Sequence, residues 1–163
     1  MTAAMARLEK GDSPELLDEA ARAFGMPVGP IELADTVGLD VCAHVGRILG
    51  YPSGGSRLEQ LVASGKLGKK SGSGFYVWKD GKPVKAERPF DKAVLDRIGR
   101  ELVEPLIAEC ERCRDEGIVE SADLVDAGVI FGTGFAPFRG GPLHYQASRG
   151  GARVANEQRA AAE

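Results

Sequence analysis

The sequence predicts a mainly α-helical protein with one small β-hairpin. Apolar residues recur at helical spacing, as in the series Leu16, Leu17, Ala20, Ala21 and Phe24. Serine or proline precedes such runs and glycine follows them, and these residues are typical start and stop signals of helices. Only residues 75–85 carry a strand signal. We therefore expect helices that pack on one another and support a single hairpin.

The first predicted helix begins at Ser13 and Pro14, because serine caps helix starts and proline suits the first turn. Gly25 ends this helix, and residues 26–30 form a turn with two prolines. Further helices are expected at residues 31–37, 39–49 and 57–64, the last two ended by Gly50 and Gly65.

A basic, glycine-rich loop follows at residues 66–74. Residues 75–78 have the apolar and aromatic character of a strand, and Asp80-Gly81 is a typical hairpin turn. Residues 83–85 are expected to return as the partner strand. A lone hairpin is marginally stable in water, so this one must pack on the helices.

The second half of the chain begins after a charged, proline-containing boundary at residues 85–89. We expect, in order, a long helix at 92–116, a helix capped by Ser121 that ends near residue 130, an irregular loop at 131–142, a short helix from Pro142, and a frayed tail after residue 150.

The two halves resemble each other. Leu17-Asp18 and Gly29-Pro30 in the first half have counterparts in Val125-Asp126 and Gly141-Pro142 in the second. We interpret this as duplication of a helical module, with a first copy at residues 1–87 and a degenerate second copy at 88–163, packed as an internal pseudo-dimer. Chance recurrence of a helix, a Gly-Pro pair and another helix is the alternative.

Composition narrows the classes of function. The net charge of −3 argues against nucleic acid as a partner, because phosphate binding requires clustered positive charge. No apolar run approaches the roughly 20 residues of a membrane span. The first residues do not read as a signal peptide, and the odd number of cysteines, 3, favours a reducing, cytoplasmic location.

Three long motifs resemble the C-terminal region of 3-hydroxyacyl-CoA dehydrogenases. Residues 25–41 (GMPVGPIELADTVGLDV) look like the segment that opens the C-terminal domain, and residues 67–76 (LGKKSGSGFY) look like the motif that closes it. Residues 132–143 (GTGFAPFRGGPL) resemble the matching segment of a second copy, which is found in the multifunctional α-subunit of fatty-acid oxidation.

This resemblance implies NAD-dependent oxidation of 3-hydroxyacyl-CoA to 3-ketoacyl-CoA in fatty-acid β-oxidation, in a parent protein that also carries an enoyl-CoA hydratase domain. It implies that the helical modules wall one side of the acyl-CoA cleft and support a dinucleotide-binding domain. It also implies homo-oligomers, because the equivalent module forms the homodimer in single-copy relatives.

We expect the chain alone to be inactive. No Gly-x-Gly-x-x-Gly follows a strand, so the phosphate-cradling turn for NAD is missing. The family's catalytic His-Glu pair belongs to the dinucleotide domain, and its substrate-holding asparagine lies on the helix before the first predicted helix. The only asparagine here is Asn156, in the tail. We therefore assign no catalytic, cofactor or metal residues to this chain.

The turn before residue 31 is the candidate substrate contact. It and the following helix offer apolar surface from Met26, Pro27, Val28, Pro30 and Leu33. Rigid turns position contacts at low entropic cost, and methionine adapts to varied shapes. The alternative is that these side chains only pack the two helices together.

Other chemistry-bearing residues have structural interpretations. We expect packing or capping roles for His44 and His144, core positions for Cys110 and Cys113, a solvated loop for Lys66, Lys69 and Lys70, bonds to loop carbonyls for Arg139, and helix-dipole roles for Glu32 and Asp35. The alternative function for the whole chain is an autonomous, non-catalytic helical module that binds acyl-CoA or a partner protein.

Overall fold

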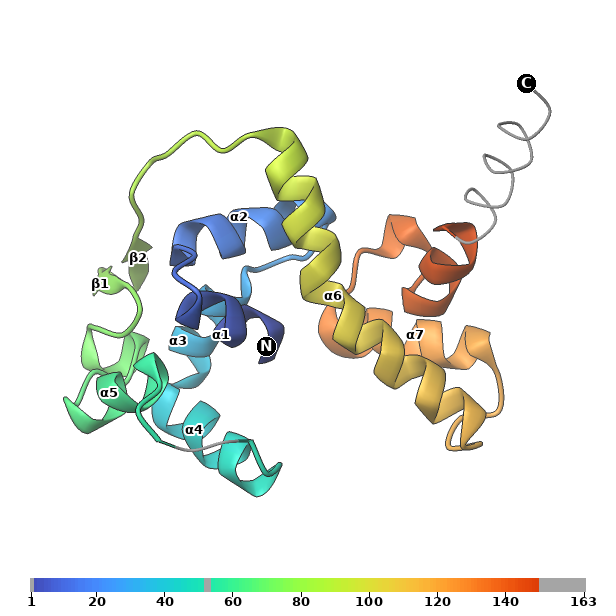
Figure 1. Ribbon diagram of the computed structural model, residues 1–163, viewed down its shortest axis with the longest axis horizontal. Helices are drawn as coiled ribbons and strands as arrows, with labels where there is room; N and C mark the ends of the chain where they lie inside the picture. The colour runs from blue at the N-terminus through green and yellow to red at the C-terminus, as the bar shows by residue number, and fades with distance from the viewer. Residues whose placement is uncertain (1, 52–53, 150–163) are drawn as a thin grey trace. The chain divides into compact units, whose positions relative to one another are not determined.

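The structure is a computed structural model that describes residues 2–51 and 54–149. It is mainly helical, as the sequence predicts. The α-helices are α1 (Thr2–Glu9), α2 (Pro14–Phe24), α3 (Pro30–Val37), α4 (Leu39–Ile48), α5 (Arg57–Ala63), α6 (Lys92–Asp115) and α7 (Ala122–Thr133), and residues 142–149 are also helical (Figure 1). Two short 3-10 turns are η1 (Lys69–Ser71) and η2 (Pro137–Arg139). The predicted frayed tail and Asn156 lie outside the described residues.

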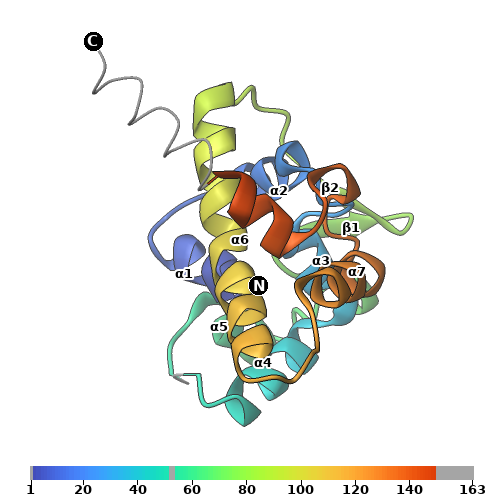
Figure 2. The same ribbon diagram turned by 90° about the vertical axis from the view of Figure 1, so that its right-hand side faces the viewer.

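Contacts divide the chain into two compact units. The first comprises the residues up to Phe24 together with Val28–Leu102, and the second comprises Gly25–Pro27 together with the residues from Val103 onward. Helix α6, continuous in both views, contributes to each unit (Figure 1, Figure 2). The predicted repeat boundary between residues 87 and 88 concerns similarity of sequence and not contacts between residues, so it stays a prediction.

Serine caps begin two of the predicted helices. Ser13 Oγ accepts a hydrogen bond from Leu16 N at 3.2 Å, and Ser121 Oγ accepts one from Leu124 N at 3.3 Å. Helix α7 continues three residues past its predicted end, to Thr133, because Gly134 supplies the left-handed C-cap with φ 70°. Helix α1 was not predicted, since no capping signal precedes it in this sequence.

The hairpin is confirmed, with strands β1 (Val77–Lys79) and β2 (Lys82–Val84) paired antiparallel. The paired residues are Val77 with Val84, Trp78 with Pro83, and Lys79 with Lys82. Asp80 and Gly81 both have positive φ, 49° and 75°, as a type I′ turn requires. Trp78 faces the core and is 9% exposed, so this strand anchors the hairpin to the helices.

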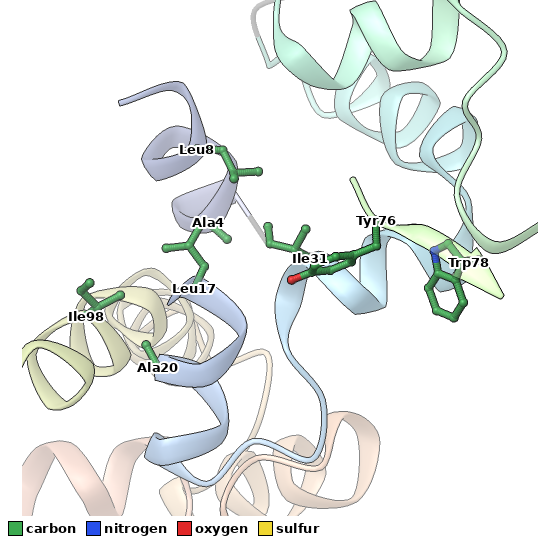
Figure 3. Close-up of a cluster of buried hydrophobic side chains, with 8 residues drawn as sticks. All are labelled: Ala4, Leu8, Leu17, Ala20, Ile31, Tyr76, Trp78 and Ile98. Carbon is green, nitrogen blue, oxygen red and sulfur yellow. The ribbon is translucent and has the colours of Figure 1, made fainter. Parts of the chain in front are cut away.

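Each unit has its own apolar core. The first unit buries Ala4, Leu8, Leu17, Ala20, Ile31, Tyr76, Trp78 and Ile98 (Figure 3). Gly99 lets α6 approach α2 closely, because a Cβ there would lie 2.6 Å from the carbonyl oxygen of Ala20. The second unit buries the smaller cluster of Cys110, Val125 and Leu143. None of the described helices is long and apolar enough to cross a membrane.

Candidate functional site: the turn before α3 and its buried carboxylates

The five candidate cleft residues lie in the turn between α2 and α3 and on α3 itself. Met26, Val28 and Pro30 are half-buried, whereas Pro27 and Leu33 are exposed. Met26 and Pro27 belong to the second compact unit, and the other three belong to the first. None of these side chains is an acid, a base or a nucleophile. The turn can therefore offer apolar contact to a ligand but no proton transfer.

Asp18, on α2, holds the start of α3. Its Oδ1 accepts a hydrogen bond from Ile31 N at 2.8 Å, and its Oδ2 accepts one from Glu32 N at 3.2 Å. These N–H groups belong to the first turn of α3 and have no partner within the helix. Gly29 is required because a Cβ at this position would lie 2.2 Å from Asp18 Cγ. The carboxylate also matches the positive end of the helix dipole.

Two side chains that flank the hairpin complete the partners of Asp18. Tyr76 Oη donates to Asp18 Oδ2 at 2.7 Å, and Lys85 Nζ lies 3.0 Å from the same oxygen. Figure 3 shows the ring of Tyr76 beside Ile31, at the start of α3. Burial, together with the charge of Asp18, raises the pKa of Tyr76 well above its usual range, so the phenol remains a donor. Because Asp18 is only 1% exposed, these partners offset the cost of burying its charge.

Glu32 extends this network towards the surface. Its Oε2 lies 2.6 Å from Lys85 Nζ and 2.7 Å from Arg22 Nη2. Burial alone raises the pKa of Glu32, but the hydrogen bonds and charges of Lys85 and Arg22 outweigh it and hold the pKa below 4.5. Glu32 lies in the first turn of α3, where the helix dipole also favours the carboxylate.

Asp35 joins α3 to the glycine-rich loop. It is fully buried, and its Oδ1 accepts a hydrogen bond from Phe75 N at 2.9 Å. Its Oδ2 accepts bonds from Tyr76 N and Trp78 Nε1, each at 2.9 Å. A Cβ at Gly74 would lie 2.2 Å from Asp35 Oδ1, so glycine is required there. The dipole role expected for Asp35 is wrong, because this residue lies in the second turn and its carboxylate binds the loop.

The second unit repeats the Asp18 arrangement. Asp126, on α7, accepts a hydrogen bond from Leu143 N at 2.7 Å and one from His144 N at 3.0 Å. These N–H groups begin the helix at residues 142–149, as Ile31 and Glu32 begin α3. A Cβ at Gly141 would lie 2.3 Å from Asp126 Cβ. Each unit therefore has a buried aspartate, a glycine against it, and a proline-started helix capped by it.

Similarities to known proteins indicate the family of the first half of the chain. Residues 1–78 match the family described as 3-hydroxyacyl-CoA dehydrogenase, C-terminal domain. Residues 1–78 of the chain belong to this family. The fatty acid oxidation complex subunit alpha of Shewanella amazonensis is 35% identical over 172 residues, which cover 94% of this chain and 24% of that protein. The Vibrio cholerae protein of the same name is 37% identical over 161 residues, or 90% of this chain and 23% of that protein. The chain thus spans about a quarter of these curated relatives.

A solved structure has a similar fold. The crystal structure of the dehydrogenase part of multifunctional enzyme 1 from C. elegans superposes with a TM-score of 0.57 and 19% identity. The match covers 74% of this chain and 32% of that one. At this identity the likeness shows the fold alone.

The sequence analysis named Asp18 only as part of the repeat and gave Asp35 a helix-dipole role, so it missed their role as buried hydrogen-bond acceptors. Asp18 lies on the apolar side of α2, between the buried Leu17 and Ala21. An acid within an apolar stripe is a usable signal, because a buried charge requires partners. Nothing in the sequence pattern identified Tyr76 or Lys85 as those partners, since both lie far along the chain from Asp18.

The candidate histidines lie at the surface, and the candidate cysteines are buried or half-buried. His44 on α4 and His144 are both exposed. Cys110 is buried in the core, as expected, and Cys113 is half-buried. Within residues 2–51 and 54–149 no group of three or more potential ligands could hold a metal ion.

Two lysines of the basic loop contact residues of the same unit. Lys70 Nζ lies 2.6 Å and 2.7 Å from the two carboxylate oxygens of Asp40, and Lys69 lies 5.4 Å from the centre of the Trp78 ring. Lys66 is exposed. Arg139 stacks on the rings of Phe138 and Tyr145, at 5.2 Å and 5.0 Å, a packing role that the sequence did not indicate.

Proposed function

We propose that the complete protein oxidises 3-hydroxyacyl-CoA to 3-ketoacyl-CoA with NAD, in fatty-acid β-oxidation, and that this chain is its helical C-terminal part. One observation carries the proposal. Asp35, in the first motif, accepts hydrogen bonds from the backbone N–H groups of Phe75 and Tyr76 in the second, and these bonds join the two motifs of the dehydrogenase C-terminal family into one folded unit. The relatives that match 90–94% of this chain are fatty acid oxidation α-subunits, which supports this proposal over an autonomous module.

NAD does not fit the residues of this chain. A dinucleotide is held by a parallel strand, a glycine-rich turn and the N-terminus of a helix. The two strands within the described residues form an antiparallel hairpin instead. We infer that a separate dinucleotide-binding domain of the longer protein holds NAD and carries the His-Glu pair. We assign no step of hydride transfer to residues of this chain.

The contribution of this chain is apolar contact with the acyl group. We propose that Met26, Pro27, Val28, Pro30 and Leu33 face the acyl-CoA cleft of the complete enzyme. The turn is rigid, because its two prolines restrict the backbone and Asp18 fixes the helix that follows. The exposed side chain of Leu33, 39% accessible on α3, is available for such contact.

We further propose that residues 1–87 and 88–163 are two copies of one module, the second degenerate. The shared pattern of a buried aspartate and a Gly-Pro helix start supports this duplication. The family match ends at residue 78, and the second half lacks a counterpart of the hairpin within its described residues.

The decisive experiment compares two proteins. A longer protein that joins this chain to its dinucleotide domain should oxidise 3-hydroxybutyryl-CoA with formation of NADH. The chain alone should neither oxidise this substrate nor bind NAD in a calorimetric titration. Absence of activity in the longer protein, or micromolar NAD binding by the chain alone, would contradict the proposal.

A further inference from the structure

Positive charge is concentrated in the loop and hairpin of the first unit. The whole chain has 21 basic and 24 acidic residues, and residues 66–85 contain six of these bases, all lysine, and one acid, Asp80. This segment therefore carries a charge of +5, and the remaining residues, with 15 bases and 23 acids, carry −8. The net charge of −3 thus combines two regions of opposite sign.

Most of these lysines have no counter-charge of their own. Lys70 pairs with Asp40, and Lys85 pairs with Asp18. No carboxylate among residues 2–51 and 54–149 forms an ion pair with the other four lysines, which are Lys66, Lys69, Lys79 and Lys82. The positive charge of the segment is therefore only partly neutralised within the described chain.

Two of these four lysines lie directly opposite each other in the hairpin. The register pairs Lys79 with Lys82 and, on the same face, Val77 with Val84. Like charges directly opposite each other destabilise a strand pair. Both valines are about half exposed, at 53% and 52%, whereas Trp78 points to the other face and is 9% exposed. The outer face of the hairpin thus combines an apolar pair with a basic pair.

A third lysine lies beside the turn of the hairpin. Lys69 Nζ is 5.4 Å from the centre of the Trp78 ring, and Lys69 Cε would lie 4.0 Å from a Cβ at Gly81. Val77, Lys79, Lys82 and Val84, together with Lys69, are called the hairpin face below. An apolar pair beside three lysines that no described carboxylate neutralises suits a partner that is anionic at its surface and apolar beneath it.

We propose that the hairpin face binds the surface of an anionic phospholipid membrane. The lysine ammonium groups pair with lipid phosphates, which also relieve the repulsion between Lys79 and Lys82. The valine side chains enter the boundary between headgroups and acyl chains. Charge complementarity selects an anionic partner, and the exposed valine pair selects lipid over a free phosphate, which offers no apolar phase.

Vesicle binding by the full chain tests this proposal. The chain is mixed with vesicles of phosphatidylcholine alone, or of phosphatidylcholine and phosphatidylglycerol in equal parts, and bound protein is measured by sedimentation. Only the anionic vesicles should bind the chain. Binding should weaken as salt is added, because salt screens exposed charges.

A pair of matched variants locates the lysines that bind. Lys79→Gln with Lys82→Gln should weaken binding to the anionic vesicles by at least about tenfold. Lys10→Gln with Lys92→Gln removes two exposed lysines outside the segment, gives the same net charge, and should bind as the original chain does. The first variant should be at least as stable as the original, because it removes a like-charge pair.

The valines separate lipid from a purely charged partner. Val77→Ser with Val84→Ser leaves the charge unchanged and should weaken vesicle binding by at least about threefold. Unaltered binding of this variant would assign the face to a partner such as an acidic polypeptide and overturn the proposal. Equal binding to both kinds of vesicle, or equal losses in the two lysine variants, overturns it as well.

Discussion

The hydroxyl of Tyr76 donates a hydrogen bond to Asp18 across 2.7 Å, between residues 58 positions apart in the sequence. This bond ties the hairpin segment to the corner between α2 and α3. Tyr76→Phe removes the donor and leaves Asp18 more poorly satisfied in a buried place. We expect a loss of about 1–3 kcal/mol in the free energy of unfolding, measured with urea.

Tyr51→Phe is the matched control for this change. Tyr51 is 48% exposed, so its substitution should not measurably alter the free energy of unfolding. Equal stability of the Tyr76→Phe variant and the original protein would mean that Lys85 and water replace the phenol fully.

Asp35→Asn tests the junction between α3 and the loop. The substitution replaces one carboxylate oxygen with an NH2 group, which cannot accept the bond from Phe75 N or, in the other orientation, the bonds from Tyr76 N and Trp78 Nε1. We expect destabilisation by about 1–3 kcal/mol, because buried N–H groups lose their acceptor. Trp78 is the only tryptophan of the chain, so its fluorescence reports the unfolding directly. Asp40→Asn, which removes the exposed ion pair with Lys70, should lower the free energy of unfolding by less than about 1 kcal/mol.

Glycine-to-alanine substitutions test the close approach to each aspartate. Gly29→Ala and Gly141→Ala each place a methyl group within 2.3 Å of an aspartate side chain. Both variants should be destabilised by at least about 1–3 kcal/mol, the usual cost of overpacking. Gly46→Ala, in α4 with nothing within 4 Å of the added methyl, should instead stabilise by about 0.5–1 kcal/mol. Stability of Gly29→Ala equal to that of the original chain would contradict the described geometry.

Glu32 predicts a pH dependence of stability. Because its folded-state pKa lies below the ordinary 4.5, the ionised carboxylate stabilises the protein above that pH and loses this effect as the pH falls through the lower value. The difference in unfolding free energy between the original protein and Glu32→Gln should therefore shrink between about pH 6 and about pH 3. Its size should remain below about 1 kcal/mol, since Glu32 is partly exposed. A difference in unfolding free energy that does not change with pH would mean that Lys85 and Arg22 do not stabilise the ionised Glu32.

Met26→Ala, made in the full-length enzyme, separates the cleft proposal from simple packing. At the cleft, the substitution should change KM or the preferred acyl chain length while the melting temperature moves little. In a packed core it should mainly lower stability, by roughly 2–5 kcal/mol. An unchanged KM and chain-length preference, together with a large loss of stability, would contradict the cleft proposal.

Sequence patterns predicted most helices and the hairpin, because their signals are local. Ser13 and Ser121 cap helices through bonds to residues three positions away, and Asp80-Gly81 adopts the type I′ turn that its residue types favour. The predicted end of α7, near residue 130, was wrong. Two glycines, Gly132 and Gly134, are possible stop signals, and only the second has the left-handed conformation.

The network around Asp18 and Asp35 could not be predicted in the same way. Its bonds to residues 75–85 join positions 40 to 67 apart in the sequence, and they depend on which loop returns to which helix. The repeated Asp-and-Gly-Pro pattern did mark the right positions, although its meaning as a helix cap became clear only from the distances.

The contact between Gly29 and Asp18 also restricts the order in which mutations can be accepted. A larger residue at position 29 collides with the carboxylate, while loss of the carboxylate leaves the N–H groups of Ile31 and Glu32 without their acceptor. Either single substitution therefore makes the protein less stable, and the second substitution does not restore the stability that the first one removed. The same holds for Gly141 and Asp126. In each unit the two residues are expected to persist together or to disappear together with the helix start that they support.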